Sequence, residues 1–270
     1  MYFTPIKAVA FDIDGTLTAS KAKITPEMAN LLCRLMADKK VLIMSGGSFH
    51  QIKTQILDYL PGKSLWKNLY LMPTSGANFF IWDSEKEEWL EKYSYRLSTE
   101  EVKKILNAFS KTLKEFEYDT LKTYGSQIEN RGTQITFSAL GQDAPIDIKE
   151  AWDPDEKKKE KIAENLRKLI PEFTIRVGGT TSVDVTRQGI DKSFGIHKFM
   201  DYTGFTASEM VFMGDALFPG GNDSAVIKTG VRTIAVRNPE DTVIHINALI
   251  SPHIAERILY NNGNHFTHGR

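Results

Sequence analysis

Two regular patterns of apolar and polar positions alternate along most of the 270-residue chain. Short apolar runs predict buried strands, and stretches with an apolar residue every three or four positions predict amphipathic helices. The first part of the chain reads strand, helix, strand, helix, strand, with the strands at 8–11, 41–44 and 69–72 and the helices at 26–36 and 52–60. This order is typical of a doubly wound parallel α/β sheet.

The middle of the chain follows a different pattern. A charged turn separates expected strands at 79–82 and 89–95, and a helix, two strands, a helix and two strands follow, at 102–113, 127–130, 133–139, 154–170, 173–177 and 182–185. Helices mixed with antiparallel strands indicate an α+β domain inserted into the first. We therefore expect a core domain of residues 1–92 and 189–270 and an inserted domain of residues 93–188.

The first pattern returns after residue 189. A helix opens near Lys192, a strand is expected at 210–213, and a tight loop at 219–223 precedes another helix. A last strand at 231–236 and a helix at 239–249 follow. The tail at 261–270 has few apolar residues and is expected to lack regular structure.

Composition narrows the class of protein. Lys plus Arg and Asp plus Glu are equal, at 34 each, which argues against a nucleic acid or an anionic membrane as the main partner. Cys33 is the single cysteine, so no disulfide forms within the chain, as fits a reducing compartment. No stretch approaches the roughly 18 apolar residues of a membrane span. A cytoplasmic protein is expected.

Candidate chemistry begins where the first strand ends, at Asp12 and Asp14. Side chains alternate along a strand, so both carboxylates can point to one side, where they need a cation or a shared proton. The pair alone is equally compatible with an ordinary strand-end turn. Ligands of such sheets gather beyond the carboxyl ends of the strands, where Ser45 and Asp215 are also expected.

The residue types at this edge suit phosphoryl transfer. Oxygen ligands without sulfur favour a hard cation such as Mg²⁺, with Asp12 and Asp215 as ligands. A transferring phosphoryl group also needs a lysine and hydroxyl or amide donors around it, which Lys192 and Ser45 provide. One aspartate can serve as the nucleophile, and a second acid two residues later can protonate the leaving oxygen.

Four segments resemble, in order, the four motifs of the haloacid dehalogenase superfamily: DIDGTLT at 12–18, IMSGGS at 43–48, GIDKSFG at 189–195 and GDALFPGGND at 214–223. The resemblance implies a Rossmann-like core with an inserted cap domain. The complete ordered set is highly specific, whereas a lone lysine or serine is not.

The resemblance also implies roles for single residues. Asp12 would be the nucleophile and a metal ligand, and Asp14 the acid/base, whose main-chain carbonyl also meets the metal. Ser45 would bind phosphate through its hydroxyl, Lys192 would bind phosphate and balance charge, and Asp215 would be the second metal carboxylate.

Neighbours of these residues have less specific roles. Asp223 resembles the acidic residue that supports the magnesium shell. Gly46 and Asn222 are candidates for substrate contact. For Asn222, and for Ser48, capping of a loop is an equally good reading.

Most of the chain further resembles the eukaryotic-type phosphomannomutases, which carry a subclass IIB cap. The matching segments are 17–28, 128–142, 177–185 and 214–226. In that family the cap supplies arginines for the distal phosphate of the sugar and a serine and an aspartate for its hydroxyls. The resemblance implies these roles for Arg131, Ser182 and Asp184. Cap dimerisation in that family leaves a homodimer open.

Other readings of these three residues remain. Arg131 beside Gly132 is also what a surface turn on an edge strand would contain. Ser182 and Asp184, two apart on a strand, share one face and could equally satisfy a buried backbone group.

Departures from the phosphomannomutase pattern affect the expected reaction. Lys21, Gln142 and Lys149 stand where arginines are expected, and Thr229 where an acidic residue is expected. Arginine binds phosphate through two parallel hydrogen bonds and lysine does not. Lys21 and Gln142 remain candidates for substrate binding, but we expect them to bind a second phosphate more weakly than arginines would.

These departures favour a Mg²⁺-dependent phosphatase of a small sugar phosphate, working through an aspartyl phosphate. The alternative is a phosphomannomutase or phosphohexomutase that interconverts hexose 1- and 6-phosphates, because a mutase must retain a bisphosphorylated intermediate. A non-catalytic phosphosugar-binding module is a third reading. It predicts a broken motif, and no motif is broken.

Overall fold

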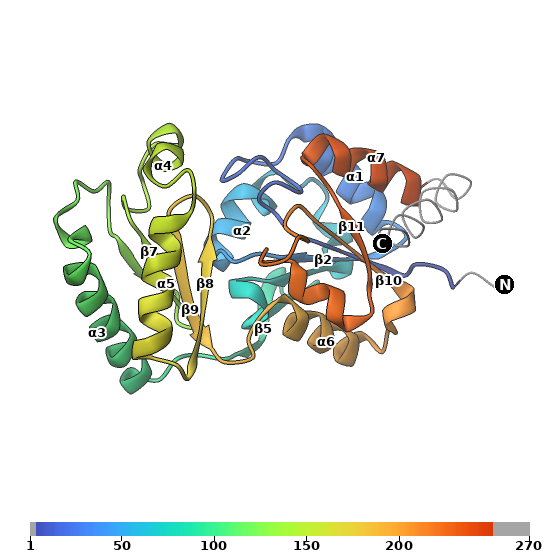
Figure 1. Cartoon of the computed structure of the whole chain (residues 1–270). Coiled ribbons are helices and arrows are strands. Elements are labelled where there is room, and N and C mark those ends of the chain that lie inside the picture. Colours follow the sequence, from blue (N-terminus) through green and yellow to red (C-terminus); the bar gives the residue numbers. More distant parts are fainter. Residues whose placement is uncertain (1–3, 251–270) are drawn as a thin grey trace, which may run out of the picture. The chain divides into compact units, whose positions relative to one another are not determined.

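The computed structural model describes residues 4–250, so the tail predicted to lack regular structure lies outside the described residues. The chain divides into two compact units (Figure 1). Unit 1 comprises residues 4–93 and 191–250 of the described chain, and unit 2 is Ser94–Ile190. Unit 2 is the green and yellow part of Figure 1.

Within the described residues, unit 1 contains a seven-stranded sheet with the order β11-β10-β1-β2-β3-β4-β5. The five strands from β11 to β3 are parallel, and β4 runs antiparallel to β3. The strands are β1 (Ala8–Phe11), β2 (Lys40–Met44), β3 (Leu69–Met72), β4 (Asn78–Asp83), β5 (Glu88–Ser94), β10 (Met210–Gly214) and β11 (Arg232–Ala235).

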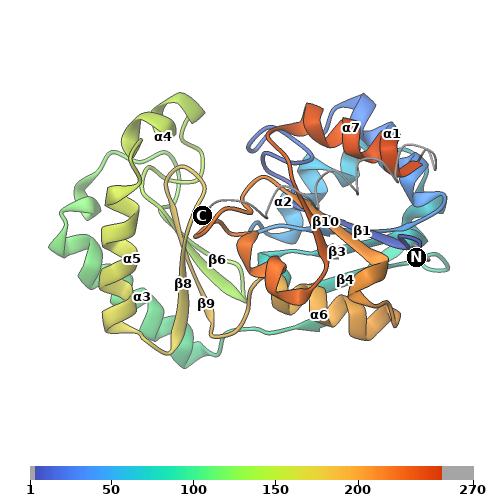
Figure 2. The same cartoon turned by 45° about the vertical axis from the view of Figure 1, so that its right-hand side comes forward.

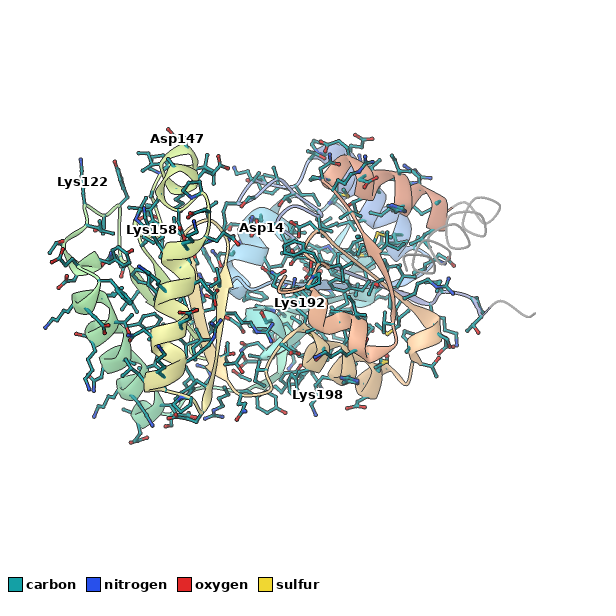
Figure 3. The ribbon with its side chains drawn as sticks, viewed as in Figure 1. Asp14, Lys122, Asp147, Lys158, Lys192 and Lys198 are labelled. Carbon is teal, nitrogen blue, oxygen red and sulfur yellow. The ribbon has the colours of Figure 1, made fainter. Side chains whose placement is uncertain are left out.

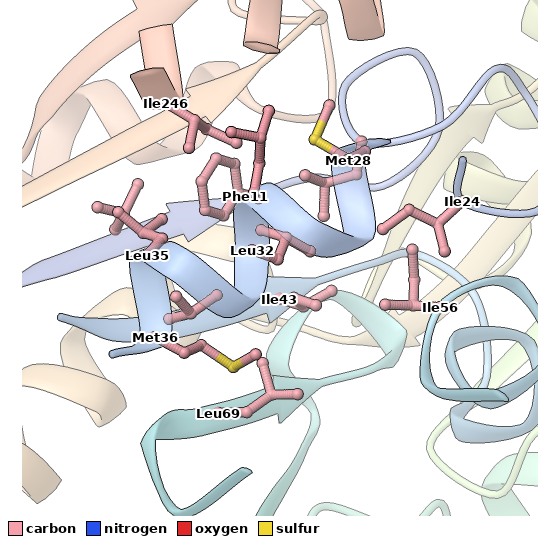
Figure 4. Close-up of a cluster of buried hydrophobic side chains, with 14 of the residues drawn as sticks. Phe11, Ile24, Met28, Leu32, Leu35, Met36, Ile43, Ile56, Leu69 and Ile246 are labelled. Atoms are coloured by element: carbon pink, nitrogen blue, oxygen red, sulfur yellow. The ribbon is translucent and has the colours of Figure 1, made fainter. Parts of the chain in front are cut away.

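Helices cover both faces of this sheet, which is why the parallel strands are apolar throughout. Alternate residues of β1 belong to two hydrophobic clusters: Phe11 packs with Leu32, and Ala10 packs in the cluster that contains Phe199. Figure 4 shows the first cluster, in which helix side chains meet those of β1 and β2. The covering helices are α1 (Pro26–Met36), α2 (Phe49–Gln55), α6 (Lys192–Thr203) and α7 (Pro239–Ile250).

The start of α1 is the one predicted from sequence. Thr25 accepts a hydrogen bond from the backbone N–H of Met28 at 3.2 Å, and proline occupies the first turn, where its missing N–H is not needed. Ser48 begins α2 through a reciprocal capping box with Gln51. The structure thus shows the capping role for Ser48.

One predicted helix is shorter than expected, and another is a 3₁₀-helix instead of an α-helix. The helix predicted over 52–60 ends at Gln55 and continues as a separate 3₁₀ turn, and the helix predicted after the 219–223 loop is also 3₁₀. The 3₁₀ segments are Leu57–Tyr59, Lys63–Asn68, Thr74–Gly76, Tyr118–Thr120, Ala207–Glu209 and Ser224–Thr229.

Unit 2 has an antiparallel sheet with the order β6-β7-β9-β8. Helices α3 and α5 pack on one face of it, where Phe109 and Leu166 meet Phe137 and Val183. The elements are α3 (Thr99–Glu115), β6 (Ile128–Asn130), β7 (Gln134–Ser138), α4 (Ile146–Trp152), α5 (Lys157–Leu169), β8 (Phe173–Gly178) and β9 (Ser182–Arg187). The predicted fold class, a doubly wound α/β core with an inserted α+β domain, is confirmed.

The order of the strands reverses direction at β1. From β1 the chain continues to β2 and β3 on one side, whereas β10 and β11 lie on the other (Figures 1 and 2). Ligands of open α/β sheets bind at such a point, beyond the carboxyl ends of the strands. Among residues 4–250, none of the helices has the length and apolar character to cross a membrane.

Candidate active site

Asp12 and Lys192 form the centre of the site in unit 1. Asp12 follows β1 and is only 4% exposed, and its backbone N–H continues the sheet by donating to Met213 O at 3.0 Å. Lys192 begins α6, and its Nζ donates at 2.5 Å both to Oδ1 of Asp12 and to Oδ1 of Asp223. One buried ammonium group therefore joins two carboxylates that are far apart in sequence. Figure 3 labels Lys192 among the side chains of this region.

A third carboxylate, that of Asp215, completes an acidic cluster. Asp12, Asp215 and Asp223 each offer an oxygen atom, and these atoms lie within 4.8 Å of one another. Gly15 and Gly214 make the approach possible, because a Cβ at Gly15 would overlap the Asp215 carboxylate and one at Gly214 would overlap that of Asp223. The three oxygens are close enough to bind one metal ion.

The cluster contains three carboxyl groups and one ammonium group, and their proximity shifts the pKa values of these groups. Burial raises the pKa of Asp12 to about 7, with a further increase from Asp223, although Lys192 opposes both. Burial and then Asp223 raise the pKa of Asp215. Burial acts to lower the pKa of Lys192, but Asp12 and Asp223 outweigh it and raise that pKa. Three carboxylates around one ammonium group favour the binding of a cation.

Asp14 lies in the same loop but has its own partners. Its Oδ1 accepts from the backbone N–H of Lys21 at 2.6 Å and from Nε2 of Gln55 at 3.2 Å, and its Oδ2 accepts from Nζ of Lys21 at 3.0 Å. Burial would raise the pKa of Asp14, but the Lys21 charge and these hydrogen bonds lower it. Lys21, predicted to bind substrate, is thus in contact with the predicted acid/base.

Gln55 was missed by the sequence analysis. It is buried on α2 and donates to Asp14 and to Ala22 O, at 3.2 Å each. A signal was present, since Gln55 falls on the apolar face of the helix, beside Ile52 and Ile56. A polar residue at such a position needs a partner in the interior.

Ser45 sits at the end of β2 in a loop held by its own hydrogen bonds. Its Oγ accepts from the N–H of Gly47 at 2.9 Å, and its carbonyl accepts from Ser75 N at 2.8 Å. Because β1 and β2 are parallel with Phe11 opposite Ile43, Ser45 and the neighbouring Gly46 lie at the same sheet edge as Asp12. The structure fixes the position of the Ser45 hydroxyl at that edge.

Three polar atoms of these loops are buried and, within residues 4–250, make no hydrogen bond: Oγ1 of Thr16, Oγ1 of Thr18 and Oδ1 of Asn222. An unsatisfied buried polar atom costs about 1–3 kcal/mol. Thr16 shares the loop of Asp12, and Asn222 adjoins Asp223, so a bound ion or phosphate would offer partners where they are missing. Thr229, by contrast, is engaged, since its hydroxyl donates to Val226 O at 2.7 Å.

The predicted residues of unit 2 lie on its sheet and in the loops beside it. Ser182 Oγ is 3.1 Å from Ser138 Oγ, and Oδ1 of Asp184 accepts from Thr136 Oγ1 at 2.7 Å. Both predicted residues therefore share one face with two further hydroxyl groups. This face is opposite to the one that α3 and α5 cover.

The predicted phosphate-binding groups of unit 2 have partners of their own. Arg131 donates from Nε and from its terminal nitrogen to Glu129, at 2.9 and 2.7 Å. Lys149 donates to the main-chain oxygen of Gln142 at 2.8 Å. The side-chain nitrogen of Gln142 is buried and has no hydrogen-bond partner within the described chain.

One family model matches most of the chain, and curated proteins are similar to it over most of its length. The family model for haloacid dehalogenase-like hydrolases matches residues 9–258. The chain is 26% identical over 249 residues to a probable phosphomannomutase of Caenorhabditis elegans, covering 90% of this chain and 94% of that protein. It is 28% identical over 247 residues to the phosphomannomutase of Spinacia oleracea, covering 88% and 94% of the two chains.

Solved structures show the same fold at low identity. An IMP-bound Plasmodium falciparum IMP-nucleotidase superimposes with a TM-score of 0.67 at 16% identity, covering 91% of this chain and 68% of that one. A haloacid dehalogenase-like hydrolase from Bacteroides thetaiotaomicron gives a TM-score of 0.62 at 18% identity, covering 94% and 99% of the two chains.

Proposed function

The chain belongs to the family of haloacid dehalogenase-like hydrolases, and on that premise we propose that this enzyme is a Mg²⁺-dependent phosphatase of small sugar phosphates. The observation that carries the proposal is the contact of buried Lys192 with Asp12 and Asp223, beside Asp215. A nucleophilic carboxylate, a fixed cation and further carboxylates are the groups that phosphoryl transfer requires.

The first step transfers the phosphoryl group to the enzyme. A carboxylate oxygen of Asp12 attacks phosphorus and the bond from phosphorus to the sugar oxygen breaks, which leaves an aspartyl phosphate. Asp14, which must carry a proton at this step although its contacts with Lys21 lower its pKa, gives that proton to the departing sugar oxygen. Lys192 offsets the charge on the phosphoryl oxygens, and Ser45 and Gly46 donate hydrogen bonds to them.

The second step returns Asp12 to its starting state. Asp14, now a carboxylate, takes a proton from water, whose oxygen attacks the aspartyl phosphorus. The bond from phosphorus to Asp12 breaks, and inorganic phosphate leaves. The same aspartate thus serves as acid and then as base.

The acidic cluster fits Mg²⁺. Its donors are all oxygen atoms, as a hard cation prefers, and the unsatisfied Oδ1 belongs to Asn222, the residue before Asp223. We assign Asp12, Asp215 and the main-chain carbonyl of Asp14 as the groups that would hold the ion, with Asp223 in support. When bound, the ion supplies positive charge against the phosphate oxygens.

Unit 2 is proposed to bind the sugar. Ser182 and Asp184 present a hydroxyl and a carboxylate on one face of its sheet, which suits the hydroxyl groups of a sugar. Arg131 and Gln142 are the further groups proposed to contact the substrate. Asp184 accepts a hydrogen bond already from Thr136, so its orientation is set before a substrate arrives.

Hydrolysis is favoured over isomerisation by the contacts of the cationic groups. Lys21 is engaged by Asp14, Lys149 by the carbonyl of Gln142, and Arg131 by Glu129. Each would have to give up or share a partner to hold the second phosphate of a retained bisphosphate. The second candidate is phosphomannomutase activity, which is what curated relatives covering most of the chain are named for.

A panel of sugar phosphates tests the proposal. Phosphate release is measured with Mg²⁺, beside a coupled assay for mannose 1-phosphate isomerisation with and without a hexose bisphosphate primer. We expect phosphate release without isomerisation, and its loss in the Asp12→Asn variant. Primer-dependent isomerisation with little release would establish the mutase instead, and neither activity would refute both.

A further inference from the structure

Gln55, the last residue of α2, is a buried amide that holds the predicted acid/base. Its Nε2 donates to Oδ1 of Asp14 and to the main-chain oxygen of Ala22, at 3.2 Å each. Both partners can only accept hydrogen bonds, so the nitrogen of the amide must face them. Gln55 therefore joins Asp14 to the loop of residues 19–24.

The main chain of Gln55 holds the same loop at a second point. Its carbonyl oxygen accepts from the N–H of Ile24 at 2.8 Å, and Ile24 is packed in the hydrophobic cluster of Figure 4. The loop contains Lys21, whose backbone N–H donates to Oδ1 of Asp14 at 2.6 Å. Gln55 thus contacts Oδ1 directly and also holds the loop that supplies the second donor to it.

The two carboxylate oxygens of Asp14 are not equivalent. Oδ1 accepts from the backbone N–H of Lys21 and from the amide of Gln55, which together use its two lone pairs. Among residues 4–250, Oδ2 accepts only from Nζ of Lys21, at 3.0 Å, and so keeps a lone pair that can carry a proton. Oδ1 is therefore the oxygen that is held, and Oδ2 is the oxygen with capacity for proton transfer.

The helix that carries Gln55 is fixed at its other end as well. Ser48 and Gln51 form the capping box that begins α2, and Ser45, the predicted phosphate-binding residue, lies three residues before Ser48. Ile52, in the middle of the helix, is fully buried. One short helix thus connects the loop that is proposed to bind the phosphoryl group with the amide that holds Asp14.

We propose that Gln55 is a positioning residue for the acid/base Asp14. By holding Oδ1, the amide fixes the orientation of the carboxyl group, so that Oδ2 exchanges the proton. In the first step the O–H bond at Oδ2 breaks as the sugar oxygen takes the proton, and in the second step Oδ2 takes a proton from the attacking water. This inference rests on the proposed function, since it concerns the same site.

The test compares Gln55→Met with Thr54→Val. Gln55→Met keeps the length of the side chain and removes the donor. Thr54 is the neighbouring residue of α2, and its hydroxyl donates to carbonyl oxygens of the same helix, so Thr54→Val alters the helix without removing a contact to Asp14. We expect Gln55→Met to slow phosphorylation of Asp12 by a hexose 6-phosphate about 10-fold, through kcat more than KM, and Thr54→Val to change it little.

The leaving group separates positioning from a general loss of structure. The departing oxygen of p-nitrophenyl phosphate is a weak base and needs no proton. Single-turnover phosphorylation of Asp12 by this compound should therefore be nearly unchanged in Gln55→Met, whereas hydrolysis of the aspartyl phosphate, which needs Asp14 as base, should slow. Equal slowing of phosphorylation by both compounds, or no slowing of either step, would overturn the inference. Gln55→Glu, which keeps the shape of the side chain and replaces the donor with an acceptor, should show the same dependence.

A double variant distinguishes failure of this inference from failure of the proposed function. If Gln55 acts through Asp14, adding Gln55→Met to Asp14→Asn should slow phosphorylation by the hexose 6-phosphate no further. A further loss as large as that in the wild-type background would overturn the inference. Because the rates report phosphorylation of Asp12, a positive result stands even if the enzyme isomerises its substrate, in which case only the phosphatase proposal fails. Absence of phosphorylation by either compound in the wild-type enzyme would refute both.

Discussion

Asp12, Asp215 and Asp223 reach one another only because two glycines leave space for them. The loop after β1 turns at Gly15, which has φ of +78° and faces the carboxylate of Asp215. Strand β10 ends at Gly214, over which the carboxylate of Asp223 lies. Single glycines thus control the spacing of the acidic cluster.

Gly15→Ala should therefore lower both stability and activity. A side chain at this left-handed φ costs about 1–2 kcal/mol, and its Cβ would displace Asp215. Gly62→Ala is the matched control, since Gly62 has φ of +73° with nothing within 4 Å of an added Cβ. We expect similar losses of unfolding free energy in urea for both variants, but weaker Mg²⁺-dependent activity for Gly15→Ala alone. Equal activity would show that Asp215 is not held by this contact.

Lys21→Met separates two roles of this lysine. In the structure the ammonium group of Lys21 contacts Asp14 and orients this acid/base. Loss of the ammonium group should therefore lower kcat. The decrease should be smaller than the roughly 10²- to 10⁴-fold that general acid–base catalysis contributes. A lysine that binds only substrate phosphate would instead raise KM. Lys23→Met is the control, because Lys23 is exposed and its ammonium group lies over the ring of Tyr59. Steady-state kinetics on one sugar phosphate decides between the two.

Sequence was enough to predict that the acidic cluster forms, and not how Asp14 is held. Asp12 and Asp215 directly follow the neighbouring parallel strands β1 and β10, so strand prediction alone places them at one edge of the sheet. Lys192 lies at the start of helix α6. The contacts of Asp14 with Lys21 and Gln55 depend on a loop conformation with φ of +59° at Lys21 and on side-chain rotamers. Hydrophobic periodicity carries no information about either.

At the scale of elements, helix ends were harder to predict than helices. The helix predicted from residue 154 begins at Lys157, because the buried carboxylate of Asp153 accepts from the N–H groups of Lys158 and Lys159 at 3.0 and 2.9 Å. Helix α4, Ile146–Trp152, was not predicted. It is only seven residues long and none of them is fully buried, so it gives little hydrophobic periodicity to detect.

Asp153→Ala should destabilise α5. Loss of an N-terminal capping carboxylate costs about 0.5–2 kcal/mol, and burial of Asp153 favours the upper part of that range. Asp155→Ala is the matched control, since Asp155 is exposed, pairs with the exposed Lys157 and accepts only a long 3.4 Å hydrogen bond from its backbone N–H; an exposed pair contributes about 0–1 kcal/mol. Urea denaturation followed by circular dichroism compares the two. A loss as large for Asp155→Ala would contradict the capping role.

At the scale of the whole molecule, each unit has its own hydrophobic core. The core of unit 2 is formed by α3, α5 and its sheet, and the clusters of unit 1 contain residues from both of its segments. The beginning and the end of unit 2 are joined by Arg187, which donates to Glu101 at 2.6 Å. An insertion with adjacent ends leaves the sheet of the host unit intact.

Excised residues 94–190 should therefore fold alone. We expect a cooperative urea transition and dispersed amide resonances, with near-ultraviolet signals from Trp152, which packs on Tyr118. Glu101→Gln, which weakens the contact between the two ends, should lower the midpoint of the excised unit. A non-cooperative transition of the excised unit would show that its core depends on unit 1.

The most direct test of the account is whether Asp12 becomes phosphorylated. The enzyme is mixed with Mg²⁺ and a sugar phosphate, quenched in acid within one turnover, and digested for mass spectrometry. We predict one phosphoryl group on the peptide that contains Asp12, and none after Asp12→Asn, with Asp14→Asn slowing its formation from substrates with poor leaving groups. Turnover without a phosphorylated peptide, a phosphoryl group on another residue, or wild-type turnover by Asp12→Asn would contradict the mechanism.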